Sequence, residues 1–183
     1  MTEIGPTLET ERLILRPPSA EDFPRWAQFM ADPEATRHIG GAQLPTVAWR
    51  SMAVMTGAWS LLGFSMFSVI EKATGRWVGR LGPWMPEGWP GTEVGWGLHP
   101  DAQGRGYAVE GAIAAIDWAF EHLGWTEVVH NIAPENIGSI RVAERLGSRK
   151  LGEARLPPPF QDLAVDAWGQ SRDEWRARQN QPA

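Results

Sequence analysis

The sequence predicts an α/β protein built on one mixed sheet, and two observations support this fold class. In the first half, strand-like stretches at residues 64–71 and 77–81 flank four turn-prone residues, which is typical of an antiparallel hairpin. In the second half, strand-like and helix-like stretches alternate, which is typical of parallel neighbours. We therefore expect antiparallel and parallel pairs in a sheet of about six or seven strands, flanked by about four helices.

The bulk composition is that of a globular protein with a single domain. The chain has 183 residues, 43% hydrophobic and 21% charged, and no apolar run reaches the roughly 20 residues that span a bilayer. Residues 1–11, which read as a loose leader, lack the basic start and the apolar run of a signal peptide. We therefore expect one domain over residues 1–183, in the cytoplasm and away from membranes.

Residue types exclude several classes of site. The chain has no cysteine, which excludes disulfides, thiolate metal sites and a cysteine nucleophile. Its four histidines follow no metal-binding spacing, so we predict no metal. The net charge of −5 gives no basic footprint for nucleic acid. A small ligand or the end of another protein is therefore the expected partner.

The first half of the chain predicts a strand and two helices ahead of the hairpin. Residues 12–16 place leucines at alternate positions, as in a half-buried strand. A helix is expected after Ser19, which stands three residues before an aspartate as in a capping box. This helix should end before Pro33, because the residue preceding a proline avoids the α region. A second helix is expected over residues 45–61, and Gly63 ends it.

The second half predicts alternating strands and helices after a proline-rich loop at residues 83–91. The expected strands are residues 92–98, 126–132, 148–154 and 162–168. On the long helix between the first two strands, apolar residues spaced 4, 3, 4 and 3 apart form a stripe that should lie on the sheet: Val109, Ile113, Ile116, Phe120 and Leu123. A shorter helix runs through Leu146 and ends at Gly147.

The turn directly before the long helix has the features of an anion site. Residues 103–106 contain two glycines, and a helix N-terminus offers unpaired N–H groups with about half a positive charge. A P-loop is excluded because its lysine and hydroxyl residue are missing. A dinucleotide fingerprint is disfavoured because Val109 stands where the third glycine or alanine belongs. The remaining interpretation is a glycine turn that brings backbone amides to a pyrophosphate, with the small Ala108 in the first helical turn.

Glu93 is the first candidate for chemistry. Side chains alternate along a strand, so Glu93, Gly95 and Gly97 share one nearly bare face of the strand at residues 92–98. The two glycines allow a ligand or a bulge to approach closely, and a single carboxylate stands at the edge of that slot. Two interpretations stay open for Glu93: an acid–base residue, or a solvated or ion-paired glutamate at the start of a strand.

Two motifs in the second half resemble one known family. Residues 103–108, followed by Glu110, resemble the acyl-CoA signature Arg/Gln-x-x-Gly-x-Gly/Ala of the GNAT N-acetyltransferases. Asn136 and Ser139 resemble the next strand-to-helix segment of that family. The stretches TERLILRP near the start and SRDEW near the end resemble its RimJ/RimL branch, so the likeness covers roughly residues 8–176.

The resemblance implies a GNAT-like fold and a bound acetyl-CoA. The sheet would be mixed, splayed and largely antiparallel, with the cosubstrate in the cleft between the strands at residues 92–98 and 126–132. The implied contacts are the amides of Gln103, Gly104, Arg105, Gly106, Tyr107 and Ala108 with the pyrophosphate, backbone near Leu98 with the pantetheine, and Asn136 and Ser139 with the distal cofactor arm. Arg141, Arg145 and Arg149 would either meet the 3′-phosphate or form a solvated face.

The family's reaction, direct attack of an amine on a thioester, asks for a base more than for an acid. A primary amine with a pKa near 10 is mostly protonated at pH 7, and Glu93 suits the role of base. A thiolate leaves readily, since its thiol has a pKa of about 8.5. Where many members carry an acidic tyrosine this chain has Ala143, so Ser139 is the candidate acid. For His130, a lone strand histidine, packing is favoured over catalysis.

Two functions follow from the resemblance. The first is an N-acetyltransferase that moves an acetyl group from acetyl-CoA to a primary amine, either a protein N-terminal α-amine or a small-molecule amine, as a monomer or homodimer. The alternative is a non-catalytic acyl-CoA-binding sensor or partner protein with the same fold. The missing tyrosine favours the alternative, and Glu93 favours the enzyme.

Overall fold

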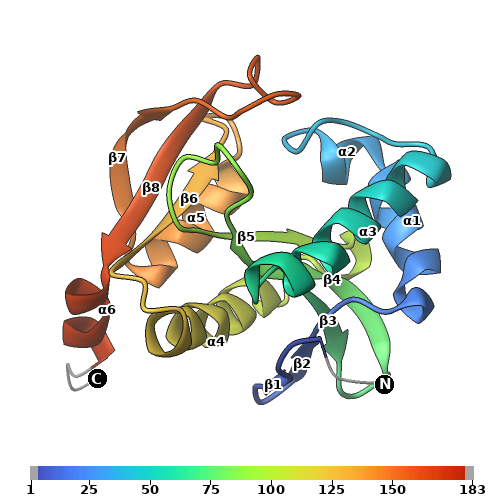
Figure 1. Cartoon of the computed structure of the whole chain (residues 1–183), viewed down its shortest axis with the longest axis horizontal. Coiled ribbons are helices and arrows are strands. Elements are labelled where there is room, and N and C mark those ends of the chain that lie inside the picture. Colours follow the sequence, from blue (N-terminus) through green and yellow to red (C-terminus); the bar gives the residue numbers. More distant parts are fainter. Residues whose placement is uncertain (1–3, 180–183) are drawn as a thin grey trace.

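An eight-stranded sheet runs through the computed structural model, which describes residues 4–179 (Figure 1). The strands are β1 (Leu8–Glu9), β2 (Leu13–Arg16), β3 (Phe67–Glu71), β4 (Arg76–Trp84), β5 (Glu93–Leu98), β6 (Glu127–Ile132), β7 (Arg149–Ala154) and β8 (Val165–Ser171). Their order in the sheet is β1-β2-β3-β4-β5-β6-β8-β7, and every neighbouring pair is antiparallel except β5 and β6. The mixed, largely antiparallel sheet is thus confirmed. It has one strand more than expected, because the short β1 forms within the predicted leader.

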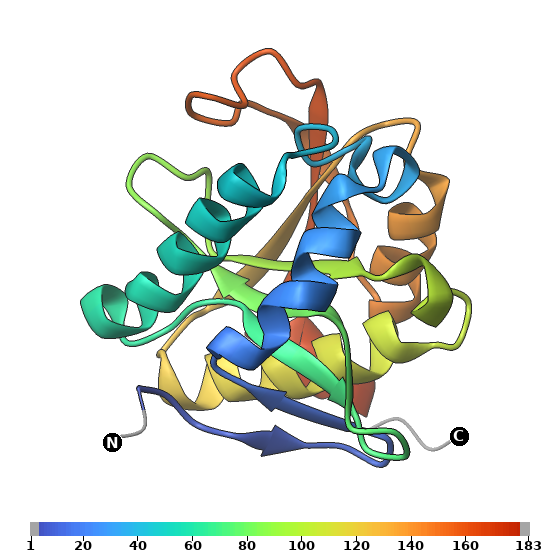
Figure 2. The ribbon, with the colours of Figure 1, turned by 90° about the vertical axis from the view of Figure 1, so that its right-hand side faces the viewer.

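The helices lie on both faces of the sheet. They are α1 (Phe23–Ala31), α2 (Pro33–Thr36), α3 (Pro45–Leu62), α4 (Tyr107–His122), α5 (Ile137–Leu146) and α6 (Arg172–Gln179), with 3₁₀ turns η1 (Ala20–Asp22) and η2 (Pro100–Ala102). Ile70 packs with α1 and α3, while its neighbour Val69 packs with α4, so α4 covers the opposite face (Figure 2). No helix within residues 4–179 is long and apolar enough to cross a membrane.

Capping residues and glycines in the sequence predicted the ends of several helices correctly. The capping box of Ser19 and Asp22 is present at η1, and Gly63 and Gly147 end α3 and α5 in the left-handed conformation. Two boundaries differ from the expectation. β4 continues through Trp84 into the predicted loop, and β8 begins at Val165 rather than near residue 162. β4 is extended by its ladder with the next strand, β5, which reaches the pair Trp84 and Glu93, and β8 follows its ladder with β6 as far as Ser171.

The order of the last strands differs from the simple strand-helix-strand expectation. β6, α5 and β7 follow one another in the chain, yet β6 and β7 are not neighbours. β8 lies between them and pairs antiparallel with both. The connection at residues 155–164 is long enough to return the chain into that gap. Of the predicted parallel pairs, the sheet therefore contains one, β5 with β6.

The buried face of α4 combines most of the predicted apolar stripe with small residues. Ile116 and Phe120 are buried, and Val109 and Leu123 pack partly buried against the same core, whereas Ile113 is 39% exposed. Three alanines of α4 are also fully buried: Ala112, Ala115 and Ala119. The helix lies so close to β4 that a Cβ atom on Gly111 would stand 2.5 Å from Leu81 Cδ2, so close packing requires a small residue there.

The sheet is splayed between β5 and β6. The two strands pair only at Glu93 and Val129, where the Val129 N–H donates to the Thr92 carbonyl at 3.0 Å. Beyond this point they diverge (Figure 1). The ring Nδ1 of His130 lies 2.7 Å from the Val94 carbonyl oxygen, across the opening. The splay leaves a wedge at the centre of the sheet, and the candidate site lies there.

Candidate active site

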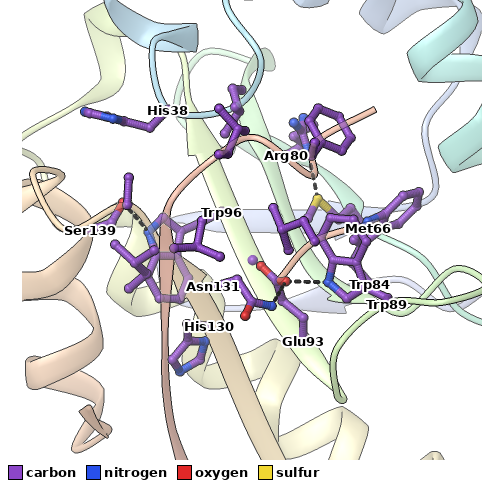
Figure 3. Close-up of a pocket in the computed structure, with 18 of the residues that line it drawn as sticks. His38, Met66, Arg80, Trp84, Trp89, Glu93, Trp96, His130, Asn131 and Ser139 are labelled. Atoms are coloured by element: carbon purple, nitrogen blue, oxygen red, sulfur yellow. Dashed lines mark hydrogen bonds between the residues drawn. The ribbon is translucent and has the colours of Figure 1, made fainter. Parts of the chain in front are cut away.

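A cavity of about 350 Å³, which we name the central pocket, opens where β5 and β6 part (Figure 3). Its walls come from β4, β5, β6, α1, α3, α5 and the loops after α2, β4 and β7. Most of the lining is apolar, with Trp84, Trp89 and Phe160 among the wall residues. Of the sequence-predicted site residues, the central pocket gathers Glu93, Asn136 and Ser139. A cavity of this size and lining suits a small organic ligand.

Glu93 is buried in the floor of the central pocket and is 7% exposed. Its Oε2 accepts hydrogen bonds from Trp89 Nε1 and Asn131 Nδ2, both at 2.6 Å. Burial raises the pKa of Glu93, although the two hydrogen bonds and the charge of Arg80 oppose the rise. Within residues 4–179 no ion pair is formed by this carboxylate. The interpretation of Glu93 as a solvated or ion-paired strand residue is therefore wrong.

The two glycines beside Glu93 do not leave an open slot. A Cβ atom on Gly95 would stand 2.8 Å from Met66 Cε, and one on Gly97 would stand 2.9 Å from Phe29 Cζ. The sequence indicated room for a ligand, but the chain's own side chains occupy this space. The glycines instead let α1 and Met66, the residue before β3, pack closely against β5, which encloses the carboxylate of Glu93.

Asn136 and Ser139 begin α5 on the far side of the wedge. The Asn136 side chain caps the helix, because its Oδ1 accepts the Ser139 backbone N–H at 3.1 Å. The Ser139 hydroxyl accepts the indole N–H of Trp96 at 3.2 Å, so its own proton remains to be donated elsewhere. Trp96 thereby spans the opening from β5 to α5 (Figure 3).

Residues 103–108, which we name the cofactor turn, are not among the lining of the central pocket. Gly104 and Gly106 adopt positive φ angles of 73° and 82°, and residues 103–106 are exposed. Gln103 Nε2 donates to the Leu98 carbonyl at 3.1 Å and so joins the turn to the end of β5. The sequence-predicted residues thus form two groups: Leu98 with the cofactor turn, and Glu93 with Asn136 and Ser139.

Charged side chains around the cofactor turn are paired with one another. Arg105 Nη1 lies 3.2 Å from Glu71 Oε1, which also accepts the Tyr107 hydroxyl at 2.6 Å. Arg12 and Glu110 form a second pair at 2.6 Å. Hydrogen bonds, of which the one from the Thr74 hydroxyl is the strongest, lower the pKa of Glu71. The hydroxyl of Tyr107 is therefore committed to Glu71, away from the central pocket.

His130 belongs to a buried polar network beneath the wedge and is 1% exposed. Because Nδ1 faces a carbonyl, it must donate, and Nε2 then accepts from the Ser148 hydroxyl at 3.0 Å. Gln170 Nε2 donates to the same hydroxyl at 2.9 Å. Burial lowers the pKa of His130 to about 4, so the ring is neutral at pH 7. These contacts agree with the packing role favoured for this histidine.

Three residues of the central pocket were not predicted from the sequence as site residues: Arg80, Asn131 and Trp96. Arg80 is the charged residue in a run of buried residues that covers most of β4. A lone arginine within such a run is a signal that was available in the sequence. The positions of Asn131 and Trp96 depend on the splay. Of the three arginines considered for a phosphate, Arg149 is paired with Glu174. No cluster of metal-binding side chains occurs within residues 4–179.

Comparison with known proteins identifies a family and a relative that match most of this chain. The family model described as "Acetyltransferase (GNAT) domain" matches residues 12–149. The p20 protein of Bacillus licheniformis, described as an uncharacterized N-acetyltransferase, is 34% identical over 152 residues, covering 81% of this chain and 85% of the relative.

Solved structures show the same fold. An acetyltransferase from Agrobacterium tumefaciens is 34% identical with a TM-score of 0.78, covering 90% of this chain and 94% of that one. RimJ of Mycobacterium smegmatis, solved in complex with CoA-disulfide, is 18% identical with a TM-score of 0.67, covering 88% and 83%. The second likeness is one of fold alone.

Proposed function

Since the chain belongs to the GNAT acetyltransferase family, we propose that it transfers an acetyl group from acetyl-CoA to a primary amine by direct attack in a ternary complex. The acceptor is a small-molecule amine or a protein N-terminal α-amine. The observation that carries the proposal is the carboxylate of Glu93, buried without an ion pair where β5 and β6 part. A buried acid with a raised pKa, facing a cavity, is typical of a functional site.

The cofactor turn supports the binding half of the proposal. It precedes the 16-residue helix α4, whose N-terminus offers free amides and partial positive charge. A Cβ atom on Gly104 would meet no atom within 4 Å, so the backbone is open to a ligand there. These features fit the pyrophosphate of acetyl-CoA on Gln103, Gly104, Arg105, Gly106, Tyr107 and Ala108. The link from Gln103 to Leu98 directs the pantetheine along β5 toward the wedge.

Glu93 is proposed as the general base. Both of its hydrogen bonds reach Oε2, which leaves Oε1 for the incoming amine. The amine nitrogen forms a bond to the thioester carbonyl carbon, its proton passes to Glu93 directly or through water, and the C–S bond breaks. Because the pKa of Glu93 is raised, its carboxylate is a stronger base than a solvated glutamate.

Ser139 is proposed as the acid that protonates the departing thiolate. The hydroxyl already accepts a hydrogen bond from Trp96, which leaves its own proton to be donated. Its contribution should be modest, because a CoA thiolate is a good leaving group. We likewise propose that Asn136 acts on the distal cofactor arm through its position at the start of α5.

The proposal is tested by separate measurements of binding and turnover. Thermal unfolding is followed with acetyl-CoA, with NAD and without ligand, and acetyl-CoA at 100 times its Kd should add roughly 2.7 kcal/mol of stability. Release of CoA thiol is then followed with a panel of amines. Glu93→Gln should lower kcat by about 10² to 10⁴ while acetyl-CoA affinity is kept.

Glu127→Gln is the matched control, because Glu127 is the exposed first residue of the parallel strand β6. It should leave both measurements unchanged. Absence of a thermal shift with acetyl-CoA would contradict the proposal as a whole. A shift without amine-dependent thiol release would indicate the non-catalytic binding protein instead. Full activity of Glu93→Gln would remove Glu93 from the mechanism.

A further inference from the structure

Arg80 on β4 is a buried cation in the wall of the central pocket. It is 8% exposed and is the only arginine in the buried class within residues 4–179. In that range it forms no ion pair, whereas Arg12, Arg16 and Arg105 each pair with a carboxylate. Burial lowers the pKa of Arg80 only to about 10, so the guanidinium stays charged at neutral pH. A buried charge of this kind calls for a compensating partner.

The contacts that Arg80 makes do not supply that partner. Nη1 donates to the thioether sulfur of Met66 at 2.8 Å, and a thioether is a weak acceptor. The guanidinium carbon lies 5.7 Å from the ring centroid of Trp26, within the range of a cation–π contact. Nε has no hydrogen-bond partner. The planar fork of donors that suits a carboxylate is therefore largely unused.

Arg80 and Glu93 lie on the same face of the sheet without touching. In the antiparallel ladder Arg80 stands opposite Gly97, and Trp84 stands opposite Glu93, so the two charged residues share one face of β4 and β5. The side chain of Met66 lies between them (Figure 3). Each charge favours the ionised form of the other, yet they form no ion pair. The central pocket is thus lined by a cation and an anion that the side chain of Met66 keeps apart.

The central pocket also holds unused hydrogen-bond acceptors, one of them beside Glu93. Asn131 donates its Nδ2 to Glu93, which fixes the orientation of the amide, and its buried Oδ1 has no partner. Gln43 Oε1, elsewhere in the lining, is likewise buried without a partner. The Asn131 acceptor beside Glu93 suits an N–H group of an amine, and the donors of Arg80 suit an anion.

From this arrangement we infer that the acceptor is a primary amine that also carries a carboxylate, as a free amino acid does, with Arg80 binding the carboxylate and Glu93 with Asn131 receiving the amine. The inference rests on the proposed function and decides between its two acceptor classes. The α-amine of a protein N-terminus adjoins an amide rather than a carboxylate, so it would leave Arg80 unpaired. The indole walls of Trp84 and Trp89 suit an apolar side chain on the amino acid.

The test compares matched probes that differ in one group. L-Phenylalanine, L-tryptophan, L-methionine and L-leucine are each assayed beside the corresponding amide and the corresponding decarboxylated amine. Release of CoA thiol gives kcat/KM, and thermal unfolding without acetyl-CoA gives binding. At least one free amino acid should exceed its amide and its amine by about 10-fold or more in kcat/KM, and should raise the Tm when the other two do not.

Arg80→Met and Arg80→Lys assign that preference to Arg80. Arg80→Met, which removes a buried unpaired charge, should fold with an unchanged or higher Tm. It should lose the preference for the carboxylate, so that kcat/KM falls by about 10-fold more with the free amino acid than with its amide. Arg80→Lys should retain part of the preference, because it keeps the charge but not the planar fork.

Several outcomes would overturn the inference. The first is that amides or amines bind and react as well as every free amino acid. The second is that the preference for the carboxylate survives in Arg80→Met. The third is an equal loss of kcat/KM with all probes in that variant, which would make Arg80 a structural partner of Trp26. If no probe reacts, the binding measurement still decides. Failure of the proposed function is recognised separately, because acetyl-CoA would then cause no thermal shift or no amine would release thiol.

Discussion

Charged side chains are arranged in opposite ways at the cofactor turn and in the central pocket. At the turn, Arg105 pairs with Glu71. In the central pocket Arg80 and Glu93 are both buried, yet neither forms an ion pair within residues 4–179. Paired charges hold a loop in place, whereas unpaired buried charges lower stability and persist where a ligand compensates them. The comparison separates the structural charges of this protein from the candidate functional ones.

The largest effect that we predict concerns His130, beneath the central pocket. Its pKa is lowered to about 4, so its stabilising contribution is complete above its ordinary pKa of 6.5 and is lost as the pH falls from 6.5 to 4. The free energy of unfolding should fall by roughly 3 kcal/mol more in the native protein than in His130→Gln over this interval. Denaturant unfolding at several pH values measures the difference. Equal pH dependence in the two proteins would show that the neutral ring does not support the pocket floor.

Gly106→Val tests whether the cofactor turn binds acetyl-CoA. A branched side chain at a φ of 82° strains the turn and blocks the approach of a phosphate, so the affinity for acetyl-CoA should fall by about 100-fold or more. Gly124→Val is the control, because Gly124 has a φ of 66° just beyond the other end of α4. It should lose stability but not affinity. Calorimetric titration that finds both affinities unchanged would show that the pyrophosphate binds elsewhere.

Trp89→Phe tests how the hydrogen bond from Trp89 controls the pKa of Glu93 in the central pocket. It removes the indole N–H that lowers the pKa of Glu93, so this pKa should rise further and the acidic limb of kcat should move to higher pH. At a fixed pH on that limb, kcat should be about 10-fold lower than in the native protein. Trp84→Phe alters the same wall without a hydrogen bond to Glu93 and should leave the limb in place. An unmoved limb in Trp89→Phe would assign it to another group.

The smallest effect contrasts two glutamates directly. Glu71 has a lowered pKa, so its carboxylate stabilises the fold above its ordinary pKa of 4.5, and this contribution is lost as the pH falls further. Glu71→Gln should therefore lower the free energy of unfolding at pH 7 by about 1 kcal/mol. Glu93, with a raised pKa, has the opposite sign, and Glu93→Gln should keep or increase stability at pH 7. Destabilisation of similar size in both variants would remove the distinction between the two regions.

Features that depend only on neighbouring residues, such as helix caps and glycine turns, could be predicted from the sequence alone. The capping box at Ser19, the left-handed glycines Gly63 and Gly147, and the glycine turn before α4 depend on backbone preferences within a few residues. The alternation of side chains along β5 also singled out Glu93. The sequence by itself therefore determined the elements, the family resemblance and the candidate base.

Tertiary structure decided what surrounds those residues. Met66 and Phe29 fill the space above Gly95 and Gly97, β8 enters between β6 and β7, and Arg80 faces the same cavity as Glu93. The first two facts join segments that are far apart in the chain, and the third depends on the pairing of β4 with β5. Burial, and with it the pKa of a carboxylate or the missing partner of a guanidinium, depends on all the segments that pack around a group. No local pattern contains that information, and so our inference about the acceptor depends on the assembled pocket.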